Sequence, residues 1–305
     1  MTEHIRLKMA AAKSRSLSDL SVNVGGDPGP MNEMEYVVMS TAGNAIDFGN
    51  LTAGRKVAMS GFCSESRGIA GGGYIPSGVT ITIDYWSMVA LGDATDFGDL
   101  TVTGHSGSGY ASDTRGIWYG GASRPTTIDY ITIASTGNAT DFGDTIDDMQ
   151  SQNDSGDSNG TRGVSGGGAC PTECNTNEYT TIASTGNGTD FGNLVVARTD
   201  PAATAGGGRM VQWGGQAAIG ADLSMDYITI ASAGNSTNFG ESLVACKSGG
   251  GSSNGTRGIF TSGTNTSGTI HNVIEYITIA STGNATDFGD SLQAKRQSVG
   301  AGYNL

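Results

Sequence analysis

The amino-acid sequence predicts an all-β fold in which six small sheets close into a six-bladed β-propeller. Three observations support this prediction. A phrase of 15 residues, clearest at Tyr276–Asp290, occurs six times along the 305-residue chain. Its residue types favour short strands and tight turns. The chain also begins and ends within a unit, so that its two ends together complete one blade, as a closed ring requires.

Each copy of the repeat keeps two aromatic residues and one acid in register. A phenylalanine recurs every 45 to 49 residues, a tyrosine precedes it by 12 positions, and an acid stands immediately before the tyrosine. Because a core repeats from blade to blade whereas a binding face varies, we predict that these aromatic residues form the core. The tyrosines are Tyr36, Tyr85, Tyr130, Tyr179, Tyr227 and Tyr276. The phenylalanines are Phe48, Phe97, Phe142, Phe191, Phe239 and Phe288. The blade acids are Glu35, Asp84, Asp129, Glu178, Asp226 and Glu275.

The order of residues within each unit predicts short antiparallel strands. Asp129–Ser135 alternates between two kinds of side chain and is typical of a strand with two different faces. Thr136–Ala139 contains a Gly-Asn pair, which tolerates a positive φ and predicts a turn before a return strand at Thr140–Asp144. A further strand begins with an arginine, and one more variable strand gives each unit about four strands. These arginines are Arg67, Arg115, Arg162, Arg209 and Arg257.

The two ends of the chain predict how the ring closes. Residues 18–305 span six units of 48 residues, and we expect this range to form one propeller. The last strand, Gln297–Leu305, is expected to pair beside the first, Leu20–Gly25, in a composite blade that locks the circle. Residues 1–17 precede the propeller as a basic arm with four Lys and Arg side chains. This arm is either a frayed, partly helical terminus or a docking segment for an acidic partner.

The repeat also resembles known families. Its order of a Gly-Gly strand, an acid-Tyr strand, a Gly-Asn turn and an aromatic-Gly return strand resembles kelch-type propeller repeats. The wording Ile-Thr-Ile-Ala-Ser-Thr-Gly-Asn-Ala-Thr-Asp-Phe-Gly-Asp, found at 277–290, resembles a repeat in structural proteins of tailed bacteriophages, including those that infect marine cyanobacteria. The resemblance covers residues 18–305. It departs from ordinary kelch blades in a longer Tyr-to-Phe spacing and in a phenylalanine where kelch repeats carry tryptophan.

The resemblance implies a function in a virus particle. It implies a non-enzymatic structural component attached to the capsid or the tail, whose partners are other virion proteins reached through the basic arm. The start of the chain shows no signal peptide, so we expect synthesis in the reducing host cytoplasm and free thiols. One competing interpretation is an adhesin that binds host-surface glycan, and a third is a glycan-active enzyme.

Composition and motif content exclude several classes of function. The 29 acidic side chains outnumber the 16 basic ones, and the net charge of −13 argues against binding to nucleic acid. No apolar run reaches about 18 residues, so no membrane-inserted helix is predicted. The histidines lie in no catalytic motif, and the spacing of Cys170 and Cys174 is not that of a metal site. Cys63 and Cys246 are expected to be small packed residues. We predict no cofactor, no metal and no catalytic residue.

The repeated arginines and acids each allow two interpretations. An arginine cluster can bind a carboxylate or a sulfate, but one arginine per blade is spread around a ring. We therefore favour a structural pairing between each repeated arginine and a blade acid. Paired acids such as Asp141 and Asp144 could ligate calcium, but their spacing is not that of a known calcium loop. Turn and strand-edge chemistry is the favoured role for them.

Residues that break the repeat are the candidates for specific binding. Trp86, Trp118 and Trp213 have no counterparts in every unit, and each is either an anchor for a partner or an ordinary packed side chain. The segments between the repeats differ in length and are rich in Ser, Asn and Gly, which is typical of surface loops on a rigid scaffold. The three longest of these predicted loops are Gln150–Gly160, Arg198–Gly208 and Thr261–Val273.

Overall fold

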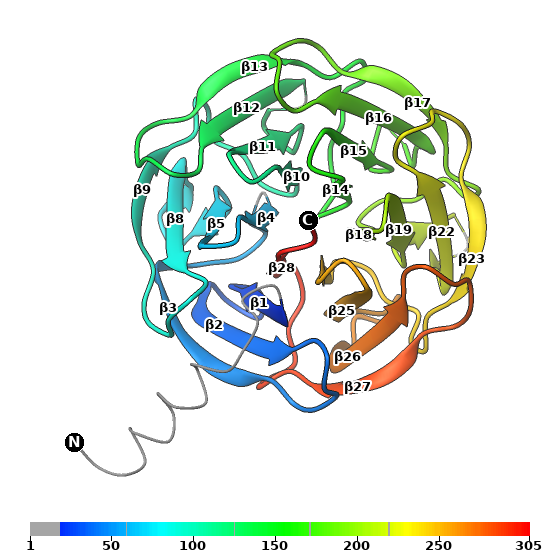
Figure 1. The fold of residues 1–305 in the computed structure, drawn as a ribbon. Helices are drawn as coiled ribbons and strands as arrows, with labels where there is room; N and C mark the ends of the chain where they lie inside the picture. The colour runs from blue at the N-terminus through cyan, green and yellow to red at the C-terminus, as the bar shows by residue number, and fades with distance from the viewer. Residues whose placement is uncertain (1–18, 59, 125, 171, 219) are drawn as a thin grey trace.

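The fold is a ring of six blades around a central axis. The computed structural model describes residues 19–305 except positions 59, 125, 171 and 219, so the basic arm expected at residues 1–17 lies outside the described residues. The named elements of this part of the chain are all β-strands, and six antiparallel four-stranded sheets surround the axis (Figure 1). The predicted six-bladed β-propeller is confirmed.

In each blade the first strand lies nearest the axis and the fourth lies at the rim. Blade 1 consists of β28 (Val299–Gly302), β1 (Leu20–Val24), β2 (Met31–Val38) and β3 (Ile46–Arg55). Blade 2 consists of β4 (Ser60–Cys63), β5 (Arg67–Gly71), β8 (Thr82–Ser87) and β9 (Thr95–Asp99). Blade 3 consists of β10 (Ser108–Ala111), β11 (Arg115–Tyr119), β12 (Thr127–Thr132) and β13 (Thr140–Asp144).

The remaining blades follow the same order. Blade 4 consists of β14 (Gly156–Ser158), β15 (Arg162–Gly166), β16 (Thr176–Thr181) and β17 (Thr189–Asn193). Blade 5 consists of β18 (Ala202–Gly206), β19 (Arg209–Trp213), β22 (Ser224–Thr229) and β23 (Thr237–Glu241). Blade 6 consists of β24 (Gly250–Ser253), β25 (Arg257–Thr264), β26 (Ile270–Thr278) and β27 (Thr286–Asp290). Two short hairpins extend the connections, β6 (Tyr74–Ile75) with β7 (Gly78–Val79) and β20 (Gln216–Ala217) with β21 (Gly220–Ala221).

The two ends of the chain close the ring as predicted. Strand β28 pairs antiparallel with β1, in a register that runs from Ser21 opposite Gly302 to Val24 opposite Val299. Blade 1 therefore takes its innermost strand from the end of the chain and its other three from the beginning (Figure 1). The innermost strands of neighbouring blades contact one another all the way around the axis, in the order β28, β4, β10, β14, β18, β24 and back to β28.

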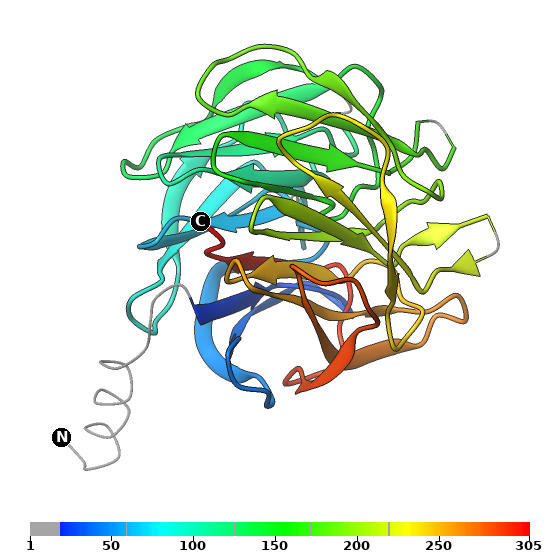
Figure 2. The ribbon, with the colours of Figure 1, turned by 45° about the vertical axis from the view of Figure 1, so that its right-hand side comes forward.

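The disc has two different ends along its axis. We call the end that holds the connections between second and third strands the hairpin end; it also holds the connections that lead from one blade to the next. The opposite, turn end holds the six turns between third and fourth strands, at residues 39–45, 88–94, 133–139, 182–188, 230–236 and 279–285. In Figure 2 the yellow-green hairpin β20–β21 projects from the body of the disc. Insertions such as this one distinguish the blades at the hairpin end.

The core lies between the blades. Each repeat tyrosine meets the phenylalanine of its own unit edge-to-face, with ring centroids 5.8 to 6.1 Å apart. All six phenylalanines are only 2–3% exposed, as predicted, and Tyr36 is buried as well. The other five tyrosines are half-buried. Clusters such as Ile69 and Phe97 of blade 2 with Ile131 of blade 3 join neighbouring blades through apolar contact.

Candidate functional site

The Gly-Asn turn of the repeat fastens each blade to the one before it. In the joint between blades 2 and 3, the Gly137 N–H donates to the Phe97 carbonyl over 2.8 Å, and the Asn138 Oδ1 accepts from the Asp99 N–H over 3.1 Å. Gly98 packs so closely that a Cβ on it would lie 2.4 Å from the Gly137 oxygen. Equivalent contacts occur at all six joints. The glycine pairs are Gly49 with Gly92, Gly98 with Gly137, Gly143 with Gly186, Gly192 with Gly234, Gly240 with Gly283, and Gly289 with Gly43.

The blade acids are also inter-blade fasteners. Each accepts a backbone N–H from the fourth strand of the preceding blade or from the connection that leaves it, as when Ile146 donates to Glu178 over 2.9 Å. The other five donors are the N–H groups of Thr52, Thr101, Val195, Leu243 and Leu292, over 2.7 to 3.2 Å. Because these carboxylates are almost fully buried, their hydrogen bonds satisfy charges that would otherwise be costly to desolvate.

The predicted pairing between repeated arginines and blade acids is wrong. Three aspartates pair instead with buried arginines outside the repeat, Asp84 with Arg55 at 2.7 Å, Asp129 with Arg124 at 2.9 Å and Asp226 with Arg198 at 2.9 Å. The glutamates use other partners: Lys295 contacts Glu35 at 2.7 Å, Tyr119 donates to Glu178 at 2.5 Å, and Glu275 accepts two backbone N–H groups. Burial raises the pKa of Glu178, Glu275 and Asp226.

The repeated arginines lie on the repeat tyrosines. Each guanidinium carbon sits 4.2 to 4.9 Å from a tyrosine ring centroid, as Arg162 does over Tyr179. Each also donates to a backbone carbonyl of the next blade, namely that of Ile133, Ile182, Ile230, Ile279 or Met39. The reason for the wrong prediction is the period of a strand. The acid immediately precedes the tyrosine and so points to the opposite face of the sheet from the arginine.

The three tryptophans are core residues. Trp86, Trp118 and Trp213 are 0–1% exposed, so their interpretation as anchors for a partner is wrong. Trp118 packs on Phe62 with ring centroids 4.8 Å apart, and Trp213 packs on Phe260 at 4.9 Å. A Cβ on Gly68 would lie 2.2 Å from the Trp86 ring and one on Gly71 2.9 Å from the Trp118 ring, so both rings pack directly on glycine backbone.

Two of the three predicted surface loops run inside the ring. Gln150–Gly160 and Arg198–Gly208 carry the chain from the rim of one blade to the innermost strand of the next, and most of their residues are buried. Of Thr261–Val273, only residues 265–269 form the exposed tip of the β25–β26 hairpin, and the remainder belongs to the two strands. The expectation of free thiols is wrong for two cysteines, because a disulfide joins Cys170 and Cys174, whose Cα atoms lie 5.7 Å apart. The other two cysteines are free and buried, as expected.

A ring of hydrogen bonds surrounds the axis at the hairpin end. In each blade, one residue just before the innermost strand adopts a positive φ of 50° to 60°. The N–H groups of these residues donate to the carbonyls of their counterparts in the neighbouring blade at four joints, from Val57 to Gln297, Gln297 to Ser248, Ser248 to Asp200 and Asp200 to Ser151. Sequence reasoning missed this ring, because valine, serine and glutamine, which hold five of its six positions, do not signal the left-handed region. We call the six residues the axial ring: Val57, Ser106, Ser151, Asp200, Ser248 and Gln297.

A cluster of charges borders the axial ring, and we call its members Asp27, Lys56, Asp200, Lys247 and Arg296 the axial cluster. Asp27 lies 3.1 Å from Arg296 and 3.6 Å from Lys56, measured between carboxylate oxygens and side-chain nitrogens. Lys247 donates to the Gln216 side chain over 2.7 Å. Burial raises the pKa of Asp200 to about 6, although Lys247 and Arg296 act in the opposite direction. Lys56 and Arg296 are 39% and 37% exposed and are available to a ligand.

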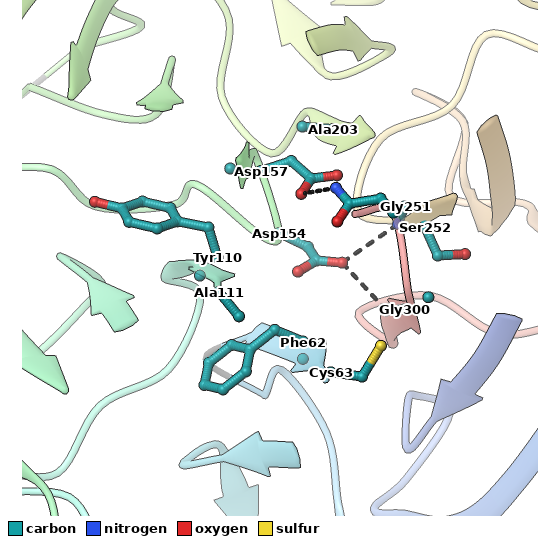
Figure 3. A pocket seen from close by; sticks show the side chains of 15 residues that line it. Phe62, Cys63, Tyr110, Ala111, Asp154, Asp157, Ala203, Gly251, Ser252 and Gly300 are labelled. Atoms are coloured by element: carbon teal, nitrogen blue, oxygen red, sulfur yellow. Dashed lines mark hydrogen bonds between the residues drawn. The ribbon is translucent and has the colours of Figure 1, made fainter. Parts of the chain in front are cut away.

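The interior of the axis holds two further carboxyl groups (Figure 3). Asp154 accepts from the Ser60 hydroxyl over 2.5 Å and from the N–H groups of Gly300 and Gly251 over 3.1 and 3.3 Å. Asp157 accepts from the Asn304 amide over 2.7 Å. Burial raises the pKa of Asp154 to about 7 and that of Asp157 to about 6. They border a cavity of about 30 Å³, which has room for roughly one water molecule.

The thiol at the axial interior is not poised for covalent catalysis. The cysteine that borders the cavity, Cys63, has its pKa raised by burial, so its thiol is not a nucleophile at neutral pH. No group of three His, Cys, Asp or Glu side chains among the described residues could hold a metal ion. The same residues contain no helix that is long and apolar enough to cross a membrane.

Comparison with known proteins gives no assignment. No protein-family model matches the chain. No curated protein matches it either. The function must therefore be argued from the repeat and from the geometry of the disc.

Proposed function

We propose that this chain is a kelch-like propeller that acts as a non-enzymatic structural component of a tailed-phage particle, seated on a capsid or tail protein. The wording of its repeat supports the phage origin. Use of the repeated residues supports a structural role, because glycine, asparagine, acid, arginine and tyrosine all serve to hold the blades together. Such a disc is a rigid part that an assembly can use.

A set of exposed aliphatic residues carries the proposal. Ile146, Val195, Leu243 and Leu292 occupy equivalent places at four consecutive joints, next to the buried blade acids, and are 46–55% exposed. We call them the aliphatic arc. At the other two joints the place is taken by Thr52 and Thr101. Burying the exposed part of each aliphatic side chain against a partner contributes about 1 kcal/mol, so the arc favours docking of one side of the disc.

The test of this proposal uses purified particles of the phage that encodes the chain. Mass spectrometry of washed particles should detect the protein at a level comparable with known structural proteins, and a Leu243→Ser/Leu292→Ser variant should incorporate several-fold less. Val89→Ser serves as the matched control, because Val89 is 49% exposed but lies at the turn end. Detection in infected-cell lysate but not in particles would contradict the proposal. A chain without residues 1–17 tests the additional proposal that the basic arm docks first.

Binding of a host-surface glycan is the second candidate function. The axial cluster favours it, since its charged side chains lie outside the repeated contacts that hold every joint, and Lys56 and Arg296 are part-exposed. A glycan-active enzyme is less well supported, because catalysis on a glycan needs carboxyl groups that converge in one open site. The most buried carboxyl groups near the axis, Asp154 and Asp157, already accept hydrogen bonds from their own chain.

A further inference from the structure

We propose that the axial cluster, with the neighbouring pair Tyr74 and His105, is a binding site for a carboxylated oligosaccharide. The proposal rests on the second candidate function and names its site and ligand class. It does not depend on whether the disc belongs to a particle.

Three cations in the described part of the propeller pair with neither the repeat tyrosines nor the blade acids. Twelve Lys and Arg side chains belong to residues 19–305. Five stack on the repeat tyrosines, and four neutralise blade acids in buried pairs. The remaining three are Lys56, Lys247 and Arg296, which come from the connections that lead into blades 2, 6 and 1. All three meet at the hairpin end of the axis, within a chain whose net charge is −13. They give the cluster a positive balance where the rest of the molecule is acidic.

The members of the axial cluster form one continuous group. Asp27 bridges Lys56 and Arg296, at 3.6 and 3.1 Å. Lys247 and Arg296 stand immediately before Ser248 and Gln297, and the N–H groups of these two ring members link Gln297 to Ser248 and Ser248 to Asp200 over 2.6 and 3.0 Å. Both cations also act electrostatically on Asp200. The cluster therefore follows an arc from blade 5 through blades 6 and 1 to blade 2. An arc of this kind suits an extended chain of sugar units better than one small ion.

An aromatic pair lies at the blade 2 end of the axial cluster. Tyr74 exchanges two backbone hydrogen bonds with Lys56, over 2.7 and 2.9 Å. Its ring lies against His105, with centroids 4.5 Å apart and planes inclined by 43°. Both rings are half-buried, and burial lowers the pKa of His105, so that its imidazole is neutral at pH 7. Half-exposed rings next to cations and amides are the side chains that contact sugar faces and hydroxyl groups.

The backbone that carries the three cations is already fixed before a ligand binds. The axial ring fixes the backbone beside Lys56, Lys247 and Arg296, since each of these residues is followed by a ring member with positive φ. Each also forms an isolated bridge to a second-to-third-strand connection of its own blade, Lys56 to Tyr74, Lys247 to Thr264 and Arg296 to Asp27. A site whose backbone is already held loses little conformational entropy when a ligand binds.

The charge pattern selects the ligand class. Three cations against Asp27 and Asp200 leave a balance of one positive charge, which suits singly charged carboxylates spaced along a chain. A phosphate dianion or a densely sulfated chain is best neutralised where several cations converge on one point, whereas here the cations are spread along the cluster and Asp27 lies between Lys56 and Arg296. The aromatic pair favours a glycan over an acidic peptide, because a pyranose ring has an apolar face and carboxylate side chains do not. An acidic glycan is therefore the occupant to test.

The cluster also predicts how binding depends on pH. The groups that face Asp200 are Lys247 and Arg296 from neighbouring connections and Thr199 from its own. Lowering the pH through about 6 neutralises Asp200 and raises the positive balance of the cluster, while a uronic acid with an ordinary carboxyl pKa stays ionised. Binding should therefore strengthen between pH 7.5 and pH 5.5.

The experiment measures binding of a hyaluronan tetrasaccharide to the full chain by titration calorimetry, with chitotetraose as the neutral control of equal length. We expect binding of the acidic sugar alone. Lys247→Gln and Arg296→Gln should each weaken it about tenfold, whereas Asp200→Asn should strengthen it at pH 7.5 and remove the pH dependence. If Asp200 had a purely structural role, Asp200→Asn would not increase the affinity. Leu243→Ser, outside the site, should leave affinity unchanged, and thermal melting of each variant verifies that it is folded.

Several results would overturn the inference. Equal binding of a poly-glutamate peptide would reduce the site to a patch of charge. Binding of chitotetraose that none of these variants alters would leave glycan binding standing and remove the assigned site. If neither sugar binds at millimolar concentration, the ligand class fails, and the second candidate function loses the observation that favours it. In every case the incorporation of the chain into particles is measured separately.

Discussion

The rim and the axis of the disc are built in opposite ways. At the rim, six joints repeat the same set of contacts, a glycine against a glycine and an Asn or Asp side chain on a backbone N–H. At the axis, the same backbone position is occupied by serine in three blades and by valine, aspartate and glutamine in the other three. The joints at the rim therefore repeat the same residues, whereas the axial positions share only a backbone conformation.

This difference separates the residues that close the ring from those that are free to bind a ligand. A ring needs equal angles at its joints, and close glycine contacts set those angles in the same way six times. Around the axis the backbone ring already meets that need, so the side chains are free to vary. The axial cluster lies in this second region. Substitutions in the two regions should therefore differ in their effects, which are given below from the largest to the smallest.

The axial interior should dominate the pH dependence of stability. Burial raises the pKa of Asp154 from 3.8 to about 7, so folding favours its protonated form. Its contribution to stability is complete below about pH 4 and is lost as the pH rises to 7. The loss amounts to at most about 4 kcal/mol. Asp154→Asn should be more stable than the parent chain at pH 8 by up to this amount and nearly equal to it at pH 4. Denaturant unfolding at the two pH values measures this, and equal stability at pH 8 would contradict it.

The rim should fail when one glycine gains a methyl group. Gly192 has a φ of +136°, and a Cβ on it would lie 2.4 Å from the Gly234 carbonyl oxygen. Gly192→Ala should therefore cost about 3 kcal/mol, from steric overlap and from a strained backbone. Gly234→Ala is the matched control from the same joint, because its Cβ would meet nothing within 4 Å. Thermal melting compares the two variants, and similar losses would show that the close contact is unimportant.

The arginine and tyrosine stacks should contribute less than the glycine contacts. Arg162 sits 4.2 Å from the Tyr179 ring centroid and donates to the Ile230 and Ala231 carbonyls. Because the guanidinium is part-exposed, Arg162→Ala should lower the free energy of unfolding by only about 1–2 kcal/mol. Arg162→Met keeps the packing of the alkyl chain and should recover part of the loss. Unchanged melting of the alanine variant would refute the structural role of this stack.

The aliphatic arc should contribute least to folding. Leu243 is 50% exposed, so Leu243→Ser should alter stability by less than about 0.5 kcal/mol. Any larger loss, measured by denaturant unfolding, would mean that the residue packs within the disc and is not free to contact a partner. Together with reduced incorporation into particles, a neutral effect on stability would assign the arc to docking.

Much of the fold could be predicted because it depends on periodic contacts. The spacing of the repeats and the position of Leu20–Gly25 relative to the C-terminal strand fixed the number of blades and the closure of the ring. Phe97 and its counterparts are core residues because the same neighbour recurs in every unit. Such contacts leave a periodic trace in the sequence.

The partners of charged residues could not be predicted, because they come from non-repeated positions. Asp84 pairs with Arg55 and Asp129 with Arg124, although the two arginines stand in different parts of their units. A repeated acid was matched to a repeated arginine, yet the adjacent tyrosine places the two on opposite faces of the sheet. The axial ring was missed for a related reason, since Val57 and Gln297 share a backbone conformation and no side-chain chemistry. The polar composition of Gln150–Gly160 predicts a surface loop, although most of its residues are buried near the axis.

A cross-link between β1 and β28 tests the closed ring most directly. Val24 and Val299 are directly paired, and Cα atoms paired in this way lie about 4.5–5.5 Å apart, within the range of a disulfide. In a Cys63→Ala background, a Val24→Cys/Val299→Cys chain should form an intramolecular disulfide under mild oxidation, and its two new thiols should resist alkylation. Val24→Cys/Ala202→Cys, whose residues belong to blades 1 and 5, should not. If both new thiols of the Val24→Cys/Val299→Cys chain still react with an alkylating reagent after oxidation, or if they link only to other copies, the closed ring is contradicted.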